Sequence, residues 1–441
     1  MSVRGGPGLL QRLIPDVGLI RSSAIVLVGD STARLLGFVF AVAAARLLTP
    51  AGYGRIAYAL ALTAIVSVLT LNAPYGLSRF LSRHQGNSRT LAIYATNWLV
   101  VIALMLAASL TLLIPIALVT GLGGAMLAAL IANLFGTAVL QTYRESQKGL
   151  NRLWATSAFW ALANLLEVIG ILIAAALGWR SPALFLTIYG LSSVAALAIM
   201  QPLAPMALDF VRALVTKSQV IAIVRFTSPL ILQGVFYNIW VGADVILVQL
   251  FRHPAVGNYA AAKTLALVLI VPPMAISTAL APRMARLAEP AVRTYLLYVV
   301  GLTAAITVPA GAVMALLGTP LITLIFGSRY ALAATIVPVL VVGQLLYGFY
   351  LVLAASWAWG LGRPQIDPVA TGAAMLVTVG VGLLLVPQAG LVGAAFAYST
   401  GAAAQLIVIA AFTGWAIFAG QKPRLGAGRE LILDGERLAE A

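Results

Sequence analysis

Long apolar stretches alternate with short polar connections along almost the whole chain. A helix needs about 20 mostly apolar residues to cross the hydrocarbon core of a bilayer, and the pattern yields twelve such stretches. They are 24–47, 56–77, 91–115, 121–141, 154–177, 183–203, 226–250, 259–281, 295–317, 331–359, 369–386 and 391–418. The shorter segment 319–327 predicts a re-entrant or interfacial turn. The sequence therefore predicts an all-α polytopic membrane protein with about twelve transmembrane helices.

Composition and charge agree with this pattern and add an orientation. Hydrophobic residues make up 62% of the chain, charged residues 9%, and the mean hydropathy is +1.02. Of the 27 Lys and Arg residues, 20 lie in connections on one side of the predicted spans and five on the other, while Arg34 and Lys263 lie within spans. Basic loops stay in the cytoplasm, so both termini are predicted to be cytoplasmic.

The net charge of +15 follows mainly from these basic loops. Basic loops beside apolar spans attract anionic lipid headgroups, so membrane lipid is the expected partner and no nucleic acid is required. The chain has no cysteine, and its loops contain no metal-ligand cluster and no Gly-rich phosphate loop. We therefore expect no metal site, no cofactor and no ATP-driven transport by this chain alone.

A weak internal repeat divides the chain into two halves of six spans. After the first span, Pro50 is followed by Gly54 and a helix start rich in small residues, and after the seventh, Pro254 is followed by Gly257 and a similar start. Halves with an even number of spans are related by an axis along the membrane normal. The predicted units are an amino-terminal lobe at 1–206, a cytoplasmic linker at 207–224, and a carboxy-terminal lobe with a short tail at 225–441. Apolar positions in and beside the linker also suggest an amphipathic surface helix: Phe210, Leu214, Val220 and Val224.

Several short motifs carry a resemblance to a known family. They include Arg34-Leu-Leu-Gly-Phe38, Ala45-Arg-Leu-Leu-Thr-Pro-Ala-Gly-Tyr-Gly54, Val224-Arg-Phe-Thr-Ser-Pro229, Ala243-Asp244, Val256-Gly-Asn-Tyr259, Leu280-Ala-Pro-Arg283, Leu324-Ile-Phe-Gly-Ser-Arg-Tyr330 and Gly390-Leu-Val-Gly-Ala-Ala395. In this order they resemble the Wzx-type polysaccharide flippases of the multidrug/oligosaccharidyl-lipid/polysaccharide (MOP) exporter superfamily.

The resemblance implies two six-helix lobes around a central cavity that opens alternately to either side. It also implies a bacterial cytoplasmic (inner) membrane protein, not an enzyme, that moves a polyprenyl-diphosphate-linked oligosaccharide. A polysaccharide polymerase and a chain-length regulator are then expected partners, and proton or sodium coupling is the expected energy source.

Asp30 and Arg34 are the first charged residues within a span, four positions apart on one helical face. A charge near mid-bilayer costs about 2.5–3.5 kcal/mol on insertion scales, so it is rarely kept without a partner or a role. Arg34 is predicted to bind the substrate diphosphate, since its planar guanidinium can pair two phosphate oxygens. The alternative is a neutralising Asp30–Arg34 pair that only orders the bundle.

Three further charged residues lie within spans. Glu167, with Asn164 nearby, is a candidate for proton coupling, because burial favours the uncharged acid. The alternative is a neutral acid that hydrogen bonds to Asn164 or to a neighbouring helix. Asp30 and Asp244 are further candidates for ion coupling or gating. Asp244 and Lys263 are predicted to lie on neighbouring helices, where Lys263 is a second cationic site or gate. The alternatives are an interhelical ion pair or a Lys263 that extends to the membrane interface.

Neutral polar residues within spans supply hydrogen-bonding groups that sugar hydroxyls need. Asn72, Gln233 and Asn238 are the candidates for substrate binding, although single Asn and Gln residues more often join helices to one another. Pro229 and the Pro272-Pro273 pair predict kinks in the seventh and eighth spans.

Two other functions compete with the flippase. A cation-coupled multidrug exporter of the same superfamily would favour an acidic, aromatic cavity, and Arg34 would repel its cationic substrates. A membrane-embedded polysaccharide polymerase or ligase typically needs a large outer loop with catalytic acids, and no such loop is present.

Overall fold

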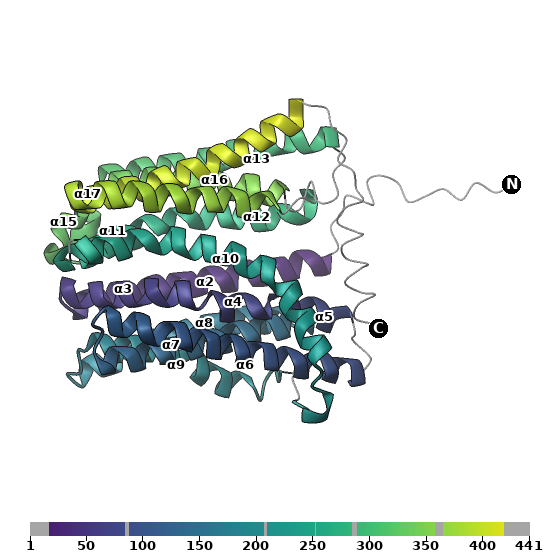
Figure 1. Ribbon diagram of the computed structural model, residues 1–441. Helices are drawn as coiled ribbons and strands as arrows, with labels where there is room; N and C mark the ends of the chain where they lie inside the picture. Colours follow the sequence, from purple (N-terminus) through teal and green to yellow (C-terminus); the bar gives the residue numbers. More distant parts are fainter. Residues whose placement is uncertain are drawn as a thin grey trace.

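Helices form almost all of the chain that the computed structural model describes, and no strand occurs among these residues (Figure 1). The described residues are 17–83, 88–206, 210–251, 253–284, 289–357 and 365–418. The first sixteen residues, part of the predicted linker and the predicted carboxy-terminal tail lie outside these ranges. The helices of the described residues, and their apolar length, confirm the predicted all-α membrane class.

The helices follow one another with short connections. In the amino-terminal part they are α2 (Val17–Leu47), α3 (Pro50–Val66), α4 (Val68–Asn72), η1 (Ala73–Gly76), α5 (Leu77–Arg83), α6 (Ser88–Val119), α7 (Gly124–Gly149), α8 (Leu153–Ala176), α9 (Pro182–Met200) and η2 (Arg212–Leu214). In the carboxy-terminal part they are α10 (Lys217–Phe251), η3 (His253–Ala255), α11 (Val256–Ala266), η4 (Leu267–Ile270), α12 (Val271–Met284), α13 (Glu289–Leu316), α14 (Gly318–Ile325), η5 (Ser328–Tyr330), α15 (Ala331–Ala334), α16 (Val337–Ala355) and α17 (Ile366–Phe418).

Ten helices of the described chain are long and apolar enough to cross a membrane. Three of the twelve predicted spans are not separate members of this set. The stretch 56–77 is divided among α3, α4 and η1, and the stretches 369–386 and 391–418 fall within the single element α17. The exact number of twelve spans therefore remains a prediction.

The element α17 consists of two antiparallel segments that meet at Gly390. This glycine has φ 57° and ψ −124°, a backbone conformation that residues with a Cβ atom rarely adopt. A hydrogen bond between the two segments shows that the chain reverses there. The Gln405 side-chain amide on the second segment donates to Thr371 on the first, at 3.1 Å. The two predicted spans on either side of Gly390 therefore pack against each other.

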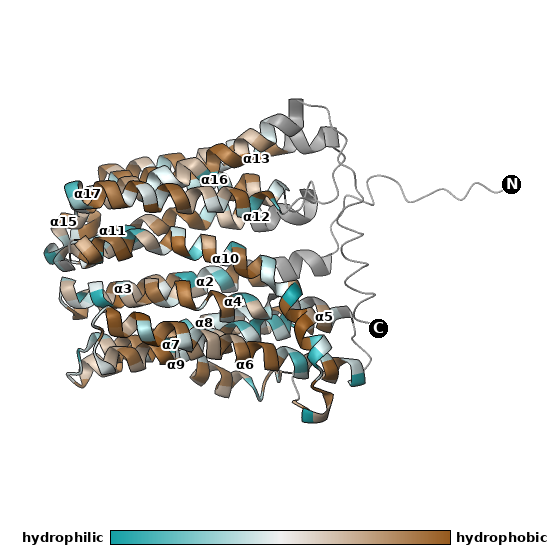
Figure 2. Cartoon of the chain, viewed as in Figure 1, coloured by the Kyte–Doolittle hydropathy of each residue, from teal (hydrophilic) through white to brown (hydrophobic). Residues whose placement is uncertain are grey.

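Most helices lie in two groups, α2 to α9 in the lower half and α10 to α17 in the upper half of Figure 1, although the first turns of α10 extend into the lower half against α6. Across the boundary, α3 packs against α10 and α11, and α10 also contacts α4 and α6. Hydrophobic residues run along most helices (Figure 2), and many large ones are exposed, including Leu118, Leu316 and Leu384. This is the surface expected of helices that face lipid.

The two ends of the bundle can be told apart by the chain direction. We call the end where α2 begins and α17 ends the basic end; it carries the connections 83–88, 149–153, 200–217, 284–289 and 357–366 and lies on the right of Figure 1. The opposite, far end carries η3, α15 and the connections 119–124 and 176–182. The charge bias predicts that the basic end faces the cytoplasm.

The region between the two groups differs from the predicted surface helix. Val220 and Val224 belong to the first turns of α10 and pack against a buried cluster that contains Trp98 of α6. Leu214 lies in the short η2 helix. The two valines therefore belong to a continuous α10 and not to a separate helix on the membrane surface. Packing against α6 favours the continuous helix, because it removes part of their side chains from water.

The predicted re-entrant segment and one of the predicted kinks have clear structural counterparts. Segment 319–327 forms the eight-residue α14, followed by Gly327 with φ 99°. The 3-10 turn η4 separates α11 from α12 directly before Pro272, consistent with the loss of a backbone donor at proline. Pro229 lies inside the continuous helix α10.

Candidate functional site

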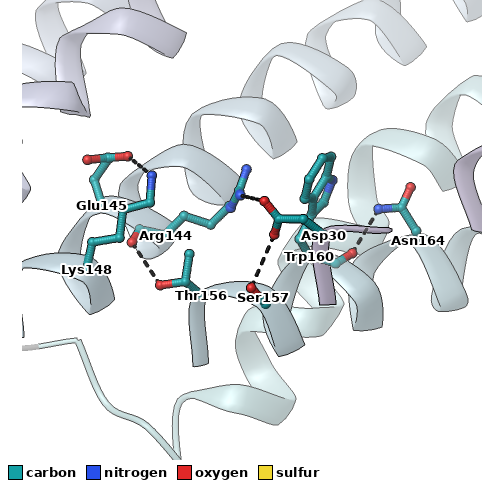
Figure 3. A network of polar contacts seen from close by, with 8 residues as sticks. All are labelled: Asp30, Arg144, Glu145, Lys148, Thr156, Ser157, Trp160 and Asn164. Carbon is teal, nitrogen blue, oxygen red and sulfur yellow. Dashed lines mark hydrogen bonds and ion pairs between the residues drawn. The ribbon is translucent and has the colours of Figure 1, made fainter. Parts of the chain in front are cut away.

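A charged cluster joins α2, α7 and α8 within a few turns of the basic end (Figure 3). Asp30 of α2 accepts an ion-pair hydrogen bond from Arg144 of α7, with 3.4 Å between Oδ2 and Nη2. Its other carboxylate oxygen accepts a hydrogen bond from Ser157 of α8 at 3.2 Å. Both side chains of the ion pair are largely shielded from solvent, so their charges are less screened than those of an exposed pair.

Trp160 of α8 brings a second arginine into this cluster. The guanidinium carbon of Arg144 lies 4.4 Å from the centroid of the Trp160 ring, and that of Arg34 lies 5.2 Å from it. Within the described part of the chain, Arg34 makes no ion pair and no hydrogen bond with its side chain. The negative face of an indole ring attracts both cations, and this contact does not use the N–H donor groups of Arg34.

The predicted Asp30–Arg34 pair is therefore not what the structure contains, although both residues lie on α2. Asp30 turns to Arg144, 114 positions away in the chain. A second pair, Lys148 Nζ to Glu145 Oε1 at 2.6 Å, lies beside it on α7. Asp30 and Glu145 thus each have a basic partner, and Arg34 is left as the excess positive charge of the cluster.

Glu167 lies deeper along α8 and is almost fully buried. Ser192 of α9 donates a hydrogen bond to its Oε1 atom at 3.3 Å, and Oε2 has no partner among the described residues. Asn164 instead donates to the carbonyl of Trp160 at 2.8 Å. Of the predicted arrangements, the contact with a neighbouring helix is the one observed, and the contact with Asn164 is not.

Asp244 and Lys263 form a buried ion pair between α10 and α11, with 2.5 Å between Oδ2 and Nζ. Tyr259 donates a hydrogen bond to the same carboxylate oxygen at 2.7 Å. Lys263 also donates to the carbonyl of Val241 at 2.5 Å and lies 4.8 Å from the ring centroid of Tyr398. The alternative of an interhelical ion pair is thus the observed arrangement. The role of Lys263 in substrate binding remains a prediction, and this arrangement does not favour it.

The three neutral candidates lie close together along α10 and α4. Gln233 donates a hydrogen bond to Asp367 at the start of α17. Asn72 and Asn238 donate to carbonyl groups of their own helices, Val68 and Gly234, both at 2.9 Å. The Asn72 amide also lies against Gly234, where the two helix groups meet.

Three residues of these sites were missed by the sequence reasoning. Arg144 is one of the 20 basic residues that the charge pattern assigns to connections, although it precedes the end of α7 by more than one turn. Trp160 gives no signal in sequence beyond its apolar surroundings. Asp367 stands directly before a long apolar stretch at an Asp-Pro step, typical of a helix start, and this could have drawn attention to it.

The far end holds the two helix groups together. Arg46 of α2 donates to the carbonyl of Ile325 at 2.7 Å and to that of Leu324. Tyr330 donates to the carbonyl of Ala45 at 2.9 Å. Cations at the carboxy-terminal end of a helix also interact favourably with its dipole, so Arg46 stabilises the contact between α2 and α14. The described residues contain no group of three His, Cys, Asp or Glu residues that could hold a metal ion.

Solved structures show the same fold. Lipid II flippase MurJ in an inward closed conformation is 14% identical, with a TM-score of 0.71 over 89% of this chain and 87% of that one. An inward-facing multidrug resistance MATE family transporter of the MOP superfamily is 15% identical, with a TM-score of 0.73 over 88% and 95%. A MOP superfamily transporter from Pyrococcus furiosus is 17% identical, with a TM-score of 0.62 over 91% and 94%.

Sequence comparison gives the family. Curated protein sequences yield no match to this chain. The family described as "Polysaccharide biosynthesis protein" matches residues 19–288, which is more than half of the chain. The chain therefore belongs to the polysaccharide biosynthesis protein family and has the fold of the MOP superfamily of transporters.

Proposed function

We propose that this protein is a flippase that moves a polyprenyl-diphosphate-linked oligosaccharide from the cytoplasmic to the outer leaflet for cell-surface polysaccharide biosynthesis. Membership of the polysaccharide biosynthesis protein family and a fold like that of a lipid II flippase support this proposal. In such a setting the oligosaccharide-lipid is the substrate. A polymerase and a chain-length regulator would act after it on the outer side.

The observation that carries the proposal is Arg34, which has no ion-pair partner among the described residues and lies beside the Asp30–Arg144 pair. A diphosphate presents several negatively charged oxygens, and the planar guanidinium fork of an arginine can bind two of them at once. Arg34 can bind the diphosphate without first losing an ion pair. Arg144 can add a second contact if its weak 3.4 Å bond to Asp30 gives way.

The position of this cluster fits the direction of transport. Arg144 and Ser157 lie within a few residues of the helix ends at the basic end, and Asp30 lies within about four turns of the start of α2. The charge bias predicts that this end is cytoplasmic. A substrate made in the cytoplasm would reach this cluster first. Release on the other side requires the contacts of Arg46 and Tyr330 at the far end to open, in an alternating-access cycle.

We assign proton coupling to Glu167. It is buried, one of its oxygens has no partner among the described residues, and it lies on α8, the helix that carries Ser157 and Trp160. Asp244 is less suited to the exchange of protons or sodium ions, because Lys263 and Tyr259 already occupy its carboxylate.

A cation-coupled multidrug exporter is the second candidate. The likeness to a MATE family transporter and the acidic Asp367 beside Tyr350 favour it. The excess positive charge at Arg34 opposes it, since an organic cation would be repelled from that cluster.

The test is transport by purified protein in liposomes that contain lipid-linked oligosaccharide extracted from cells that make this protein. The fraction of oligosaccharide on the outer leaflet is measured with a sugar-cleaving enzyme that does not cross the membrane. We expect Arg34→Ala to abolish transbilayer movement and Arg34→Lys to keep a part of it, because Lys lacks the planar fork.

Arg180→Ala is the matched control, since Arg180 is exposed in the α8–α9 connection. Equal movement with Arg34→Ala and Arg180→Ala would refute the role of Arg34. Movement of ethidium without movement of the oligosaccharide would favour the exporter.

A further inference from the structure

A pocket of about 320 Å³ lies between α10, α12, α16 and α17, within the carboxy-terminal helix group. Its volume is near the lower end of the range of about 300–1,000 Å³ that small-molecule sites occupy. The residues that line the pocket include Gln233, Tyr237, Ser277, Tyr350, Asp367 and Thr371. Ser277 precedes the end of α12 by two turns, and Asp367 stands at the start of α17, so this pocket lies in the same half of the bundle as the Arg34 cluster.

One wall of the pocket is a fixed hydrogen-bond network around Asp367. Each carboxylate oxygen accepts one bond, Oδ1 from Tyr350 and Oδ2 from Gln233. The Tyr350 hydroxyl also lies 3.4 Å from Thr371 Oγ1, which accepts a bond from Gln405 at 3.1 Å. Each carboxylate oxygen has a further lone pair for an outside donor, and the Gln233 amide presents both a donor and an acceptor.

The opposite wall contains an unsatisfied hydroxyl. Ser277 Oγ of α12 is buried and has no hydrogen-bond partner among the described residues, although it lines the pocket. A buried polar atom without a partner costs stability, so its presence beside a pocket indicates a group that a bound molecule completes.

Tyrosine rings form part of the remaining lining, together with the aliphatic side chains of Met274, Leu351, Ala354 and Ala355. The rings of Tyr347 and Tyr350 are stacked with centroids 5.8 Å apart and an interplanar angle of 16°. The Tyr347 hydroxyl lies 3.5 Å from that of Tyr237, whose side chain is 37% exposed at the pocket. Aromatic rings present a flat apolar face with a negative quadrupole, which matches the face of C–H groups on a sugar ring.

We propose that this pocket binds one sugar ring of the oligosaccharide, a ligand with hydroxyl groups around its edge and an apolar face. This inference rests on the proposed function. Sugar hydroxyls donate to Asp367 and accept from Ser277, and the ring packs on the tyrosines. An organic cation would use Asp367 but would leave Ser277 without a partner.

The Arg34 cluster and the pocket would then bind different parts of one substrate. Arg34 on α2 binds the charged diphosphate, and the pocket binds the neutral sugar. Helices α2 and α12 are in contact, so the two sites lie on either side of the boundary between the helix groups. A substrate that bridges this boundary can bias the relative position of the groups, because only differential binding shifts such an equilibrium.

The test compares two probes on purified protein in detergent. The first is undecaprenyl diphosphate, which has no sugar, and the second is the lipid-linked oligosaccharide fraction extracted from cells that make this protein. Asp367→Asn and Ser277→Ala are the variants, because Asn has nearly the size of Asp and Ala removes only the hydroxyl group of Ser277. We expect each to weaken binding of the second probe by about ten-fold, the loss of one good hydrogen bond, and to leave binding of the first probe unchanged.

Arg34→Ala separates failure of this inference from failure of the proposed function. It should weaken binding of both probes. If Arg34→Ala does so while Asp367→Asn and Ser277→Ala bind the second probe as the unaltered protein does, the sugar pocket is wrong and the flippase proposal stands. Equal weakening of both probes by the pocket variants would also overturn the pocket. If the unaltered protein binds neither probe, the proposed function and this inference fall together.

Discussion

Gly54 of α3 and Gly257 of α11 lie directly against each other at the far end of the bundle. A Cβ atom added to Gly54 would lie 2.8 Å from the amide nitrogen of Gly257 and 3.3 Å from its Cα. These are the two glycines that the internal repeat aligns. Equivalent positions of two related halves come together near the axis that relates them, so this contact is what such an axis predicts.

We expect Gly54→Ala to destabilise the protein, because the new methyl group would lie 2.5 Å from Val256 Cγ1. Overpacking of this kind costs about 1–3 kcal/mol, which exceeds the gain of about 1 kcal/mol from replacing a helical glycine by alanine. The midpoint of thermal unfolding in detergent should therefore fall. Gly52→Ala is the control on the same helix, since its methyl group meets only ordinary contacts at 3.4 Å. A Gly54→Ala midpoint equal to or above that of Gly52→Ala would mean that the halves do not approach this closely.

The partner of Asp30 can be measured with double-mutant cycles on thermal stability. The cycle of Asp30→Asn with Arg144→Gln should give a coupling free energy of about 1 kcal/mol, as residues in one ion pair do. The cycle of Asp30→Asn with Arg34→Gln should give a value near zero within error. If the coupling free energy of Asp30 with Arg34 is as large as that with Arg144, Asp30 also interacts with Arg34 on the same helix. That result would weaken the proposal that Arg34 is available to bind the diphosphate.

Lys263 is predicted to stabilise the bundle through Asp244. Lys263→Met leaves a buried carboxylate without its cation, which typically costs about 3–5 kcal/mol, so folded protein in the membrane should fall sharply. The double change of Lys263→Met with Asp244→Leu should restore much of that yield, because neither charge is left alone. Transport by the rescued double variant would show that Lys263 does not bind substrate. A variant that folds but does not transport would support a substrate role.

Glu167→Gln tests proton coupling. If Glu167 carries the proton, the variant should fold normally, because the amide can still accept the Ser192 hydrogen bond, but transport should lose its dependence on the pH gradient. Glu145→Gln is a useful control, since Glu145 is also a buried carboxylate on the neighbouring helix but is paired with Lys148. An unchanged gradient dependence in Glu167→Gln would remove this residue from the coupling mechanism.

The orientation can be tested directly because the sequence contains no cysteine. Single cysteines at Lys217, exposed at the basic end, and at Arg180, exposed at the far end, can be labelled in whole cells with a maleimide that does not cross membranes. We expect Arg180→Cys to react and Lys217→Cys to react only after the cells are opened. The reverse pattern would mean that the basic end faces outward.

Much of the architecture could be predicted because hydropathy is a local property of the chain. The apolar stretches predicted membrane helices, the basic loops distinguished one end of the bundle, and Pro50 to Gly54 and Pro254 to Gly257 indicated related halves that the contact between the two glycines supports. The pairing of Asp244 with Lys263 could also be predicted from the sequence. One short connection joins α10 and α11, so these two helices are expected to be neighbours.

The candidate sites depended on relations that the linear sequence does not contain. Spacing placed Asp30 beside Arg34, yet the packing of α2 against α8 brings Asp30 to Arg144 of α7 and leaves Arg34 without an ion-pair partner among the described residues. Gln233 and Asp367 meet only because α10 packs against α17. Hydropathy alone determines which segments enter a membrane, whereas the partner of each buried charge depends on which helix faces which, and that is decided by side-chain packing in three dimensions.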